Sequence, residues 1–305
     1  MLARAGKPAR PLCLVYGNCQ ADPVRGLLAN SAEFAASYEA VRIPAVHEIS
    51  ASQIPRLHRL FRGASLIVAQ RVKDDYRGLP LGTDQVVALA PRGCSVIRFP
   101  ALYYDALYPL QVYVHVDDRL SVPAPRTDYH DLRTLCAAAK DLTVEAAVRW
   151  VGQYRPPEAA LHATAAQAAA MIRHYEGMSD VRILDRIIAP PRAHARSFFT
   201  VSHPARFVLQ AIADSVHEIL GFARASDVHG AREPLGLFRT PLEQPVIDAL
   251  ELASEPAPDW IIKGKRVSTA DVVRLHLHWY RQHPNIVEAG LREHAGRVTA
   301  FDLLR

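Results

Sequence analysis

The chain has 305 residues, of which 50% are hydrophobic and 22% charged, and its formal net charge at pH 7 is +5. Such a chain can bury a large core, and its apolar runs are too short to span a bilayer. Its short basic groups exclude a polymer-binding stripe, and four cysteines without a CxxC pair predict neither a disulfide framework nor a metal site. We therefore expect a cytoplasmic globular protein with no nucleic-acid partner, no membrane insertion and no metal.

Residues 12–115 alternate between apolar β-type runs and helical patterns. The predicted strands are Leu12–Tyr16, Tyr38–Ile43, Ser65–Ala69 and Cys94–Phe99, and the predicted helices are Val24–Ala36, Ser50–Phe61 and Thr83–Ala90. Near-continuous hydrophobic strands of this kind are covered on both faces. The pattern predicts an α/β subdomain with a parallel sheet, whose ligands gather at the carboxyl ends of the strands.

The stretch GNCQ, residues 17–20, follows the first predicted strand. We predict that a helix begins at Pro23 with Asp22 as its N-cap, so that free N–H groups face Cys19. Such a position favours the thiolate and offers donors to an oxyanion. Cys19 is therefore a candidate nucleophile.

The residues around Cys19 fit this interpretation. Gly17 permits a sharp turn, and the side-chain amides of Asn18 and Gln20 are candidate oxyanion or substrate contacts. The competing interpretation is a buried structural thiol, which suits Cys13, Cys94 and Cys136 better because they lie in apolar runs.

The spacing from Cys19 to Arg25 also matches C-x5-R, the pattern by which tyrosine-phosphatase-type enzymes wrap a phosphate. That chemistry needs a loop of inward N–H groups without a nearby anion. Here the loop contains Asp22 and Pro23, which are an anion and a residue without an N–H donor. We rank this reading low.

Polar residues also follow the third and fourth predicted strands. Gln70 and Arg71 should lie on the same sheet edge as Cys19, where Arg71 and Lys73 suit a phosphorylated ligand. Tyr103 and Tyr104 follow the fourth strand, and they either line a sugar or adenine site or pack beneath the next helix.

A Pro-, Asp- and Arg-rich segment, Asp117 to Asp131, separates this subdomain from a mainly helical remainder. The predicted helices there are Thr134–Tyr154, Glu158–Glu176, Ala205–Phe222 and Thr269–Gln282. We accordingly divide the chain into residues 1–116 and residues 117–305.

In the second region, the stretch FFTVSHP brings His203 to the predicted start of a helix at Pro204. A helix dipole there would hold the imidazole neutral near pH 7, the form that a general base requires. The alternative is a histidine that only caps its own helix. Thr200 occupies the place where related hydrolases often carry an acid, so no acid partner of His203 is visible.

Four stretches in this order resemble the WcbI family: GNCQ, AQRVKDDYRGLP, FPALYY and FFTVSHP. These are polysaccharide-biosynthesis proteins regarded as capsular O-acetyltransferases. The resemblance covers about residues 12 to 210 and implies an esterase-like three-layer α/β subdomain embedded in a larger helical and loop-rich cradle. It also implies coenzyme A or acetyl-CoA as co-substrate, a sugar hydroxyl as acceptor, and other capsule-assembly proteins as possible partners.

Carried over by position, the resemblance implies catalytic roles for Cys19 and His203 and a cofactor-binding role for Gln70, Arg71 and Tyr76. Two other functions use the same residues. One is an esterase or deacetylase in which water is the acceptor, and the other is a CoA-binding accessory protein without catalysis of its own.

Overall fold

The computed structural model describes residues 10–116, 121–188, 196–224 and 232–304. The chain divides into two compact units: the first comprises residues 1–102, 172–188 and 206–234, and the second comprises residues 103–171, 189–205 and 235–305. The sequence suggested a single boundary after residue 116. That division remains a prediction; the compact units of the structure change after residue 102, and the chain returns twice to the first unit. The first four residues of the Pro-rich segment, 117–120, lie outside the described residues.

The first unit is built on a four-stranded parallel sheet of order β2-β1-β3-β4. Its elements are β1 (Leu12–Tyr16), α1 (Ala21–Ala29), α2 (Ala32–Ser37), β2 (Glu39–Val41), α3 (Ile54–Arg62), β3 (Ala64–Ala69), α4 (Thr83–Val87), β4 (Ser95–Arg98), α8 (Leu184–Ile188) and α9 (Arg206–Leu220), with 3₁₀ turns at Val46–Glu48, Ala51–Gln53 and Tyr76–Gly78. All four predicted strands are present, and the predicted α/β fold class is confirmed.

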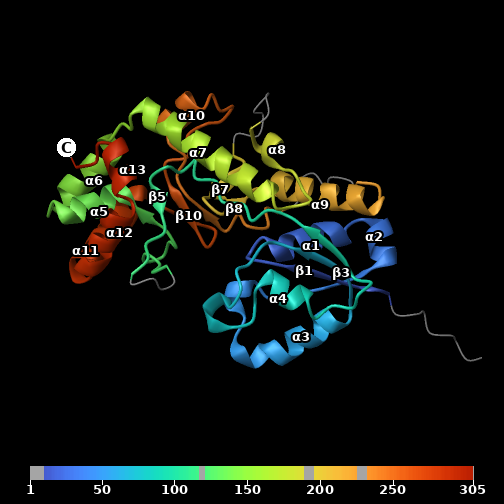
Figure 1. Ribbon diagram of the computed structural model, residues 1–305. Coiled ribbons are helices and arrows are strands. Elements are labelled where there is room, and N and C mark those ends of the chain that lie inside the picture. The colour runs from blue at the N-terminus through green and yellow to red at the C-terminus, as the bar shows by residue number, and fades with distance from the viewer. Residues whose placement is uncertain (1–9, 117–120, 189–195, 225–231, 305) are drawn as a thin grey trace, which may run out of the picture. The chain divides into compact units, whose positions relative to one another are not determined.

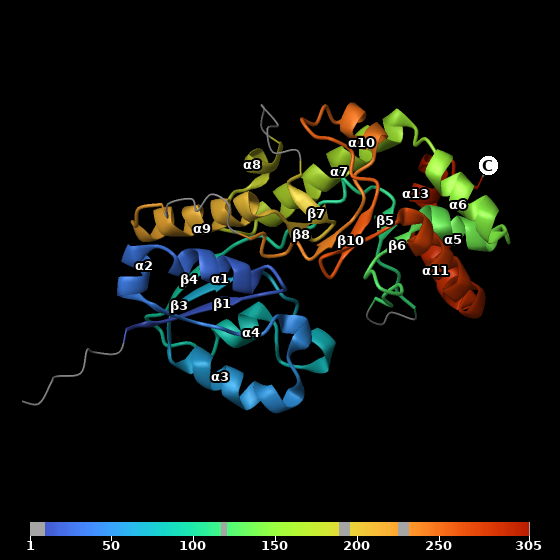
Figure 2. The same cartoon turned by 180° about the vertical axis from the view of Figure 1, so that it is seen from behind.

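Helices cover both faces of this sheet (Figures 1 and 2). On one face, Leu14 and Ile67 pack with Leu57 and Phe61 of α3 and with Val86 of α4. On the other face lies α1, and α9 packs against α1. Strands with apolar side chains on both faces require this three-layer arrangement, because neither face of the sheet can be left exposed to water.

All three predicted helices of the first unit are interrupted or shortened, and the one predicted at Thr83–Ala90 ends at Val87. The pattern over residues 24–36 divides into α1 and α2, because the Ser31 hydroxyl accepts the Phe34 N–H and starts a new helix. The helix predicted from Ser50 begins as a 3₁₀ turn and becomes α-helical at Ile54.

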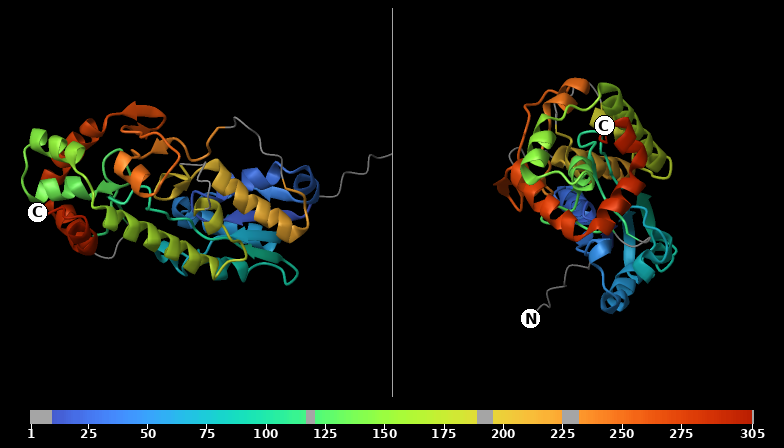
Figure 3. Two further views of the ribbon diagram at one scale, coloured as in Figure 1. Left: turned by 90° about the horizontal axis from the view of Figure 1, so that it is seen from above. Right: turned by 90° about the vertical axis from the view of Figure 1, so that its left-hand side faces the viewer.

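The second unit combines helices with small antiparallel sheets. Its elements are β5 (Gln111–Val112), β6 (His130–Asp131), α5 (Leu132–Ala139), α6 (Val144–Gln153), α7 (Glu158–Glu176, in which the boundary after residue 171 falls), β7 (Phe198–Thr200), β8 (His203–Pro204), β9 (Phe238–Arg239), α10 (Gln244–Ala249), β10 (Trp260–Ile262), β11 (Lys265–Val267), α11 (Thr269–Gln282), α12 (Pro284–Glu293) and α13 (Ala295–Ala300). Helices α11 and α12, coloured red, pack on α5, and α11 also packs on α6 (Figure 3).

The predicted helix over residues 134–154 is two helices, α5 and α6. They separate where Asp141 has a φ of 49° and Thr143 caps α6 through the Ala146 N–H. The helices predicted at Glu158–Glu176 and Thr269–Gln282 have the predicted bounds. Among the described residues, no helix combines the length and the apolarity needed to cross a bilayer.

Candidate active site

The carboxyl ends of β1 and β3 form the centre of the candidate site in the first unit. Strand β1 pairs with β2 on one side and with β3 on the other, so the order of the strands reverses between β1 and β3. A crevice forms outside the strand ends at such a switch point, and ligands bind there. Residues 17–20 leave β1 at this point, and Gln70 and Arg71 leave β3 beside them, since Tyr16 pairs with Ala69.

The turn after β1 is held by Asn18. Its backbone oxygen accepts the Ala21 N–H at 3.0 Å, and its Oδ1 accepts the Gln20 N–H at 2.9 Å. Helix α1 therefore begins at Ala21, and the predicted start at Pro23 with Asp22 as N-cap is wrong. The physical reason is that Asn18 satisfies the first N–H groups before the chain reaches Pro23.

This turn also changes the expected oxyanion donors. The N–H groups of Gln20 and Ala21 already bind Asn18, and Pro23 has none. The Asn18 amide nitrogen has no hydrogen-bond partner among the described residues, and it adjoins Cys19 in the turn. The Asn18 side-chain amide is thus one donor that this turn offers to an oxyanion.

The arginine of the C-x5-R pattern is held by an aspartate. Arg25 donates from Nε to Asp22 Oδ1 at 2.7 Å, and Arg42 lies 3.1 Å from the other carboxylate oxygen. A phosphate cradle would require Arg25 to leave this carboxylate. The geometry therefore disfavours a tyrosine-phosphatase-type phosphate site at this turn, as the sequence did.

Gln20 and Gln70 form a buried amide pair beneath the turn. Gln70 Nε2 donates to Gln20 Oε1 at 2.8 Å, and Gln70 Oε1 accepts the Asn18 N–H at 2.9 Å. The Gln20 amide also binds the backbone of Leu102, accepting its N–H at 3.1 Å and donating to its carbonyl at 2.7 Å. Both side chains are essentially inaccessible to solvent. Their amides hold the ends of β1, β3 and β4 together. The direct ligand contacts that the sequence suggested for them remain a prediction.

Gly17 is required by the same pair. A Cβ atom at residue 17 would lie 2.3 Å from Gln70 Oε1 and 2.9 Å from Gln70 Cδ. Any side chain there would push the Gln70 amide away from the Asn18 N–H. Gly17 is therefore needed for the close approach of the buried amide.

The residues after β3 provide the exposed cations of this edge. Arg71 and Lys73 are exposed, and one Arg71 amino group contacts the Met178 sulfur at 2.7 Å. Tyr76 is half-buried and packs against the core between the sheet and α3. Of the residues expected to bind the cofactor, Arg71 and Lys73 are thus the ones available to a phosphate.

Cys19 differs from the other cysteines in its surroundings. Cys13 and Cys136 are fully buried, and burial raises the pKa of each thiol to about 12. Cys94 comes just before β4, at the opposite edge of the sheet, and burial raises its pKa as well. Cys19 is half-buried in the polar turn after β1, so it is the thiol that a ligand at this edge would meet.

In the second unit, His203 lies in a β-hairpin and not at a helix start. It pairs with Thr200, Pro204 pairs with Phe198, and α9 begins only at Arg206. The predicted start at Pro204 is wrong because a proline also fits an edge strand, where its missing N–H is not needed. Burial, not a helix dipole, lowers the pKa of His203, and Asp128 opposes this shift.

His203 Nδ1 is buried and has no hydrogen-bond partner among the described residues. A lowered pKa leaves the ring neutral near pH 7, as a general base requires. Asp128, on the loop before β6, is the acid whose charge acts on this ring. Sequence reasoning missed it because about 75 residues separate the two in the chain.

A network of hydroxyl groups surrounds the same hairpin. The Tyr129 hydroxyl lies 2.8 Å from Thr200 Oγ1 and 2.8 Å from Ser202 Oγ, and Tyr113 lies 3.3 Å from Ser202 Oγ. Two of these hydroxyl groups, those of Thr200 and Ser202, belong to the FFTVSHP stretch, so the sequence already pointed to this part of the network. The two tyrosines could not be found from local patterns.

The structure separates the roles of the two tyrosines expected to bind substrate. Tyr103 is half-buried with its ring 6.1 Å from that of Tyr113, at the border of the hydroxyl network. Tyr104 is buried, packs its ring 5.3 Å from Phe198 and donates its N–H to Val201. Tyr104 therefore packs in the core, whereas Tyr103 can still line a sugar or adenine site.

Within the described part of the chain, no group of three or more His, Cys, Asp or Glu residues is arranged to hold a metal ion.

Comparisons with known proteins agree with this architecture. A family profile described as the polysaccharide biosynthesis enzyme WcbI matches residues 12–225. A solved structure of WcbI, described as a novel polysaccharide biosynthesis enzyme in its native form without a disulfide bond between CoA and one of its cysteines, has the same fold. It superimposes with a TM-score of 0.81 at 20% sequence identity, over 97% of this chain and 98% of that one. The comparison with curated proteins finds no match.

Proposed function

Because the chain belongs to the WcbI family of polysaccharide biosynthesis enzymes, we propose that it transfers an acetyl group from acetyl-CoA to a hydroxyl of a capsular polysaccharide or its sugar precursor. The observation that carries this proposal is the position of Cys19, a half-buried thiol where β1 and β3 end and the strand order reverses. The description of the solved relative names CoA together with one of its cysteines. We infer that Cys19 is the residue that meets the CoA sulfur in this chain.

The charges on the sheet edge support a CoA-type donor. CoA carries a pyrophosphate and a ribose phosphate, and exposed Arg71 and Lys73 supply two positive charges near the end of β3. Gln20, Gln70 and Gly17 contribute by fixing the turn that presents Cys19. Tyr76 supports the loop that carries the two cations through its packing on the core.

The proposed reaction transfers the acetyl group from sulfur to oxygen. The sugar oxygen forms a bond to the acetyl carbon, the carbon–sulfur bond breaks, and the hydroxyl proton passes to His203 and then to the departing thiolate. The acetyl group moves either directly from CoA or through Cys19. In the second route the Cys19 sulfur first forms a bond to the acetyl carbon, the bond to the CoA sulfur breaks, the thiol proton passes to the CoA thiolate, and the sugar oxygen then attacks the acetyl-cysteine. In both routes Asn18 provides an amide donor for the oxyanion. His203 serves as the base in both.

Calorimetry with CoA tests the donor. We expect CoA to bind more tightly than ADP, and Arg71→Ala to weaken CoA binding by about 1.5–3 kcal/mol, the usual value of a charge-assisted hydrogen bond. Arg62→Ala is the matched control, because Arg62 is exposed at the end of α3, before β3 begins, on the opposite edge of the sheet. Equal affinities for wild type and Arg71→Ala would place the phosphates elsewhere.

Replacement of His203 tests the base. His203→Ala should lower the rate of acetyl transfer by roughly 10²–10⁴-fold, the usual contribution of a positioned base, while CoA still binds. His278→Ala, an exposed histidine on α11, should leave the rate unchanged. Transfer at the wild-type rate in His203→Ala would remove this residue from the mechanism, and hydrolysis of acetyl-CoA at the same rate with and without sugar would favour an esterase.

The pH dependence of the wild-type rate follows from the same residue. Because burial lowers the pKa of His203 below its ordinary 6.5, the ring stays deprotonated as pH falls through 6.5 and takes up its proton only at more acid pH. The acid limb of the rate profile should therefore have its midpoint below pH 6.5. A midpoint at or above that value contradicts a buried neutral base.

A further inference from the structure

The second unit contains a cavity of about 750 Å³ that none of the proposed catalytic residues lines. It is bounded by the end of α6, the start of α7 and the segment from Pro241 to Ala249. A smaller recess shares Pro156, Pro241, Glu243 and Thr269 with it and extends toward β5 and β6. The cavity has the size that a small ligand or a short sugar chain occupies, whereas the recess beside it measures only about 30 Å³ and has room for one small polar group.

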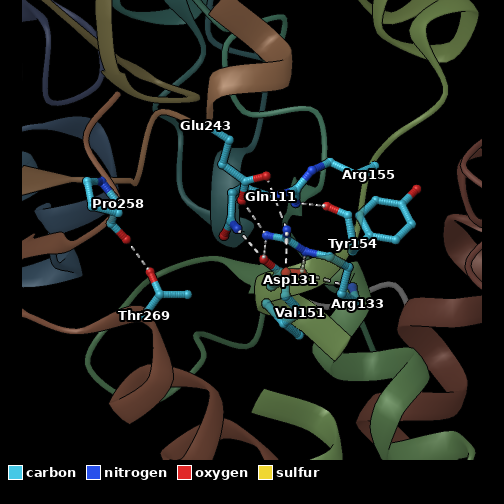
Figure 4. A network of polar contacts seen from close by, with 9 residues as sticks. All are labelled: Gln111, Asp131, Arg133, Val151, Tyr154, Arg155, Glu243, Pro258 and Thr269. Atoms are coloured by element: carbon cyan, nitrogen blue, oxygen red, sulfur yellow. Dashed lines mark hydrogen bonds and ion pairs between the residues drawn. The ribbon is translucent and has the colours of Figure 1, made fainter. Parts of the chain in front are cut away.

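Two buried polar atoms line the recess without a partner. Gln111 Oε1 and Thr240 Oγ1 have no hydrogen bond among the described residues, and the two side chains are 5% and 2% exposed. The orientation of the Gln111 amide is fixed, because its nitrogen donates to Asp131 Oδ2 at 2.8 Å (Figure 4). An unsatisfied buried polar atom costs roughly 1–3 kcal/mol, so these two atoms require a polar partner, which is either a water molecule or a group of a ligand.

The charges of the site disfavour an anion. Arg133 donates to Asp131 and to Glu243 in a buried fork, so its positive charge is already neutralised (Figure 4). The wall of the cavity carries the carboxylates of Glu158, Glu243 and Asp248 against a single arginine, Arg155. Phosphate groups such as those of CoA would meet net repulsion here.

The remaining surface suits the face of a sugar ring. Prolines 156, 241, 245, 256 and 258 line the cavity together with the Tyr154 ring, and Trp260 lines the recess. These flat apolar surfaces cover the C–H groups of a ring, and the carboxylates and amide oxygen accept from its hydroxyl groups.

We infer that this cavity binds an uncharged, hydroxyl-rich carbohydrate, a part of the acceptor chain. The role as acceptor rests on the proposed function, whereas binding itself requires no transfer. The sugar donates one hydroxyl to Gln111 Oε1 and exchanges a hydrogen bond with Thr240, and it thereby satisfies both buried atoms.

Saturation-transfer NMR on the full chain tests the inference without CoA. The probes are methyl glycosides of neutral hexoses, 6-deoxyhexoses and N-acetylhexosamines, with glucose 6-phosphate as the charged comparison. We expect at least one neutral glycoside to bind and glucose 6-phosphate not to bind. Added CoA should leave the neutral glycoside in place.

Thr240→Val is the decisive variant, since it removes the unpartnered hydroxyl and preserves the shape. It should leave the melting temperature unchanged or raise it, and it should lower the affinity for the glycoside roughly threefold to tenfold, the value of one hydrogen bond. Thr134→Val is the matched control, because the Thr134 hydroxyl is also buried and unpartnered among the described residues but does not line the site.

The inference is overturned if no neutral glycoside binds, if Thr240→Val binds it as tightly as wild type, or if CoA displaces it. These outcomes are separable from failure of the proposed function. If a glycoside binds at Thr240 but is never acetylated, the cavity is a carbohydrate site and the proposed acetyl transfer is wrong. If Thr240→Val transfers acetyl groups with an unchanged KM for the sugar, the proposed function holds and the cavity is not the acceptor site.

Discussion

Cys19→Ala should reduce acetyl transfer to the sugar acceptor by at least about 10³-fold if the thiol carries the acetyl group, because a lost nucleophile can cost as much as about 10⁶-fold. The cause is local. The turn around residue 19 is held by Asn18 and by the buried Gln20–Gln70 pair, so the alanine variant keeps its backbone and loses only the sulfur. The rate is measured as acetyl-sugar formed, beside calorimetry that confirms CoA binding.

Cys94→Ala is the control, since Cys94 lies at the opposite edge of the same sheet. It should transfer acetyl groups at the wild-type rate. A Cys19→Ala enzyme of full activity would show that the sugar attacks acetyl-CoA directly, and it would leave His203 as the principal catalytic residue. If CoA itself no longer binds, Cys19 belongs to the binding site and not to the chemistry.

Arg133→Met should lower the free energy of unfolding by about 3–5 kcal/mol, the usual cost of breaking a buried ion pair from one side. Arg133 is 4% exposed, and its Nη2 lies 2.7 Å from both Asp131 Oδ2 and Glu243 Oε1. The variant leaves two carboxylates without their cation and one of them, Asp131, buried. Urea denaturation measures the loss as the shift in midpoint multiplied by the slope.

Two further variants test whether this loss of stability comes from the unpaired buried charge. Arg274→Met breaks an exposed pair with Asp271 and should cost no more than about 1 kcal/mol. Arg133→Met combined with Asp131→Asn and Glu243→Gln should recover much of the loss, because no unpaired charge is then buried. If the single and triple variants are equally unstable, the fork stabilises through packing and not through charge.

The α/β architecture could be predicted because its strands carry a local signal. Leu12–Tyr16 is a continuous apolar run bounded by Pro11 and Gly17, and the observed strand has the same bounds. Helix boundaries were less accurate where a polar residue competes for backbone N–H groups, as Ser31 does. The short strands of the second unit, such as Phe238–Arg239, are too brief to show a period.

The candidate site was predictable in its position and not in its contacts. Cys19, Gln70 and Arg71 follow neighbouring strand ends, and the parallel order brings them together as expected. The amide of Gln70 was assigned to a ligand because a motif shows which residues are near an edge but not which of them pair with each other. The contact between residues 20 and 70 depends on the completed sheet, as does the burial that sets the pKa of His203.

The late return of the chain to the first unit has a consequence for synthesis. Helix α9 covers α1, and the His217 and Phe222 rings lie 5.7 Å and 6.3 Å from the Phe34 ring. While the ribosome makes the residues between Leu102 and Phe222, for roughly 6–24 s at ordinary rates of elongation, this apolar helix face has no cover. A chain that terminates in that interval exposes Phe34 and aggregates, so the first unit, although it emerges first, cannot complete its fold until residue 222 has been made.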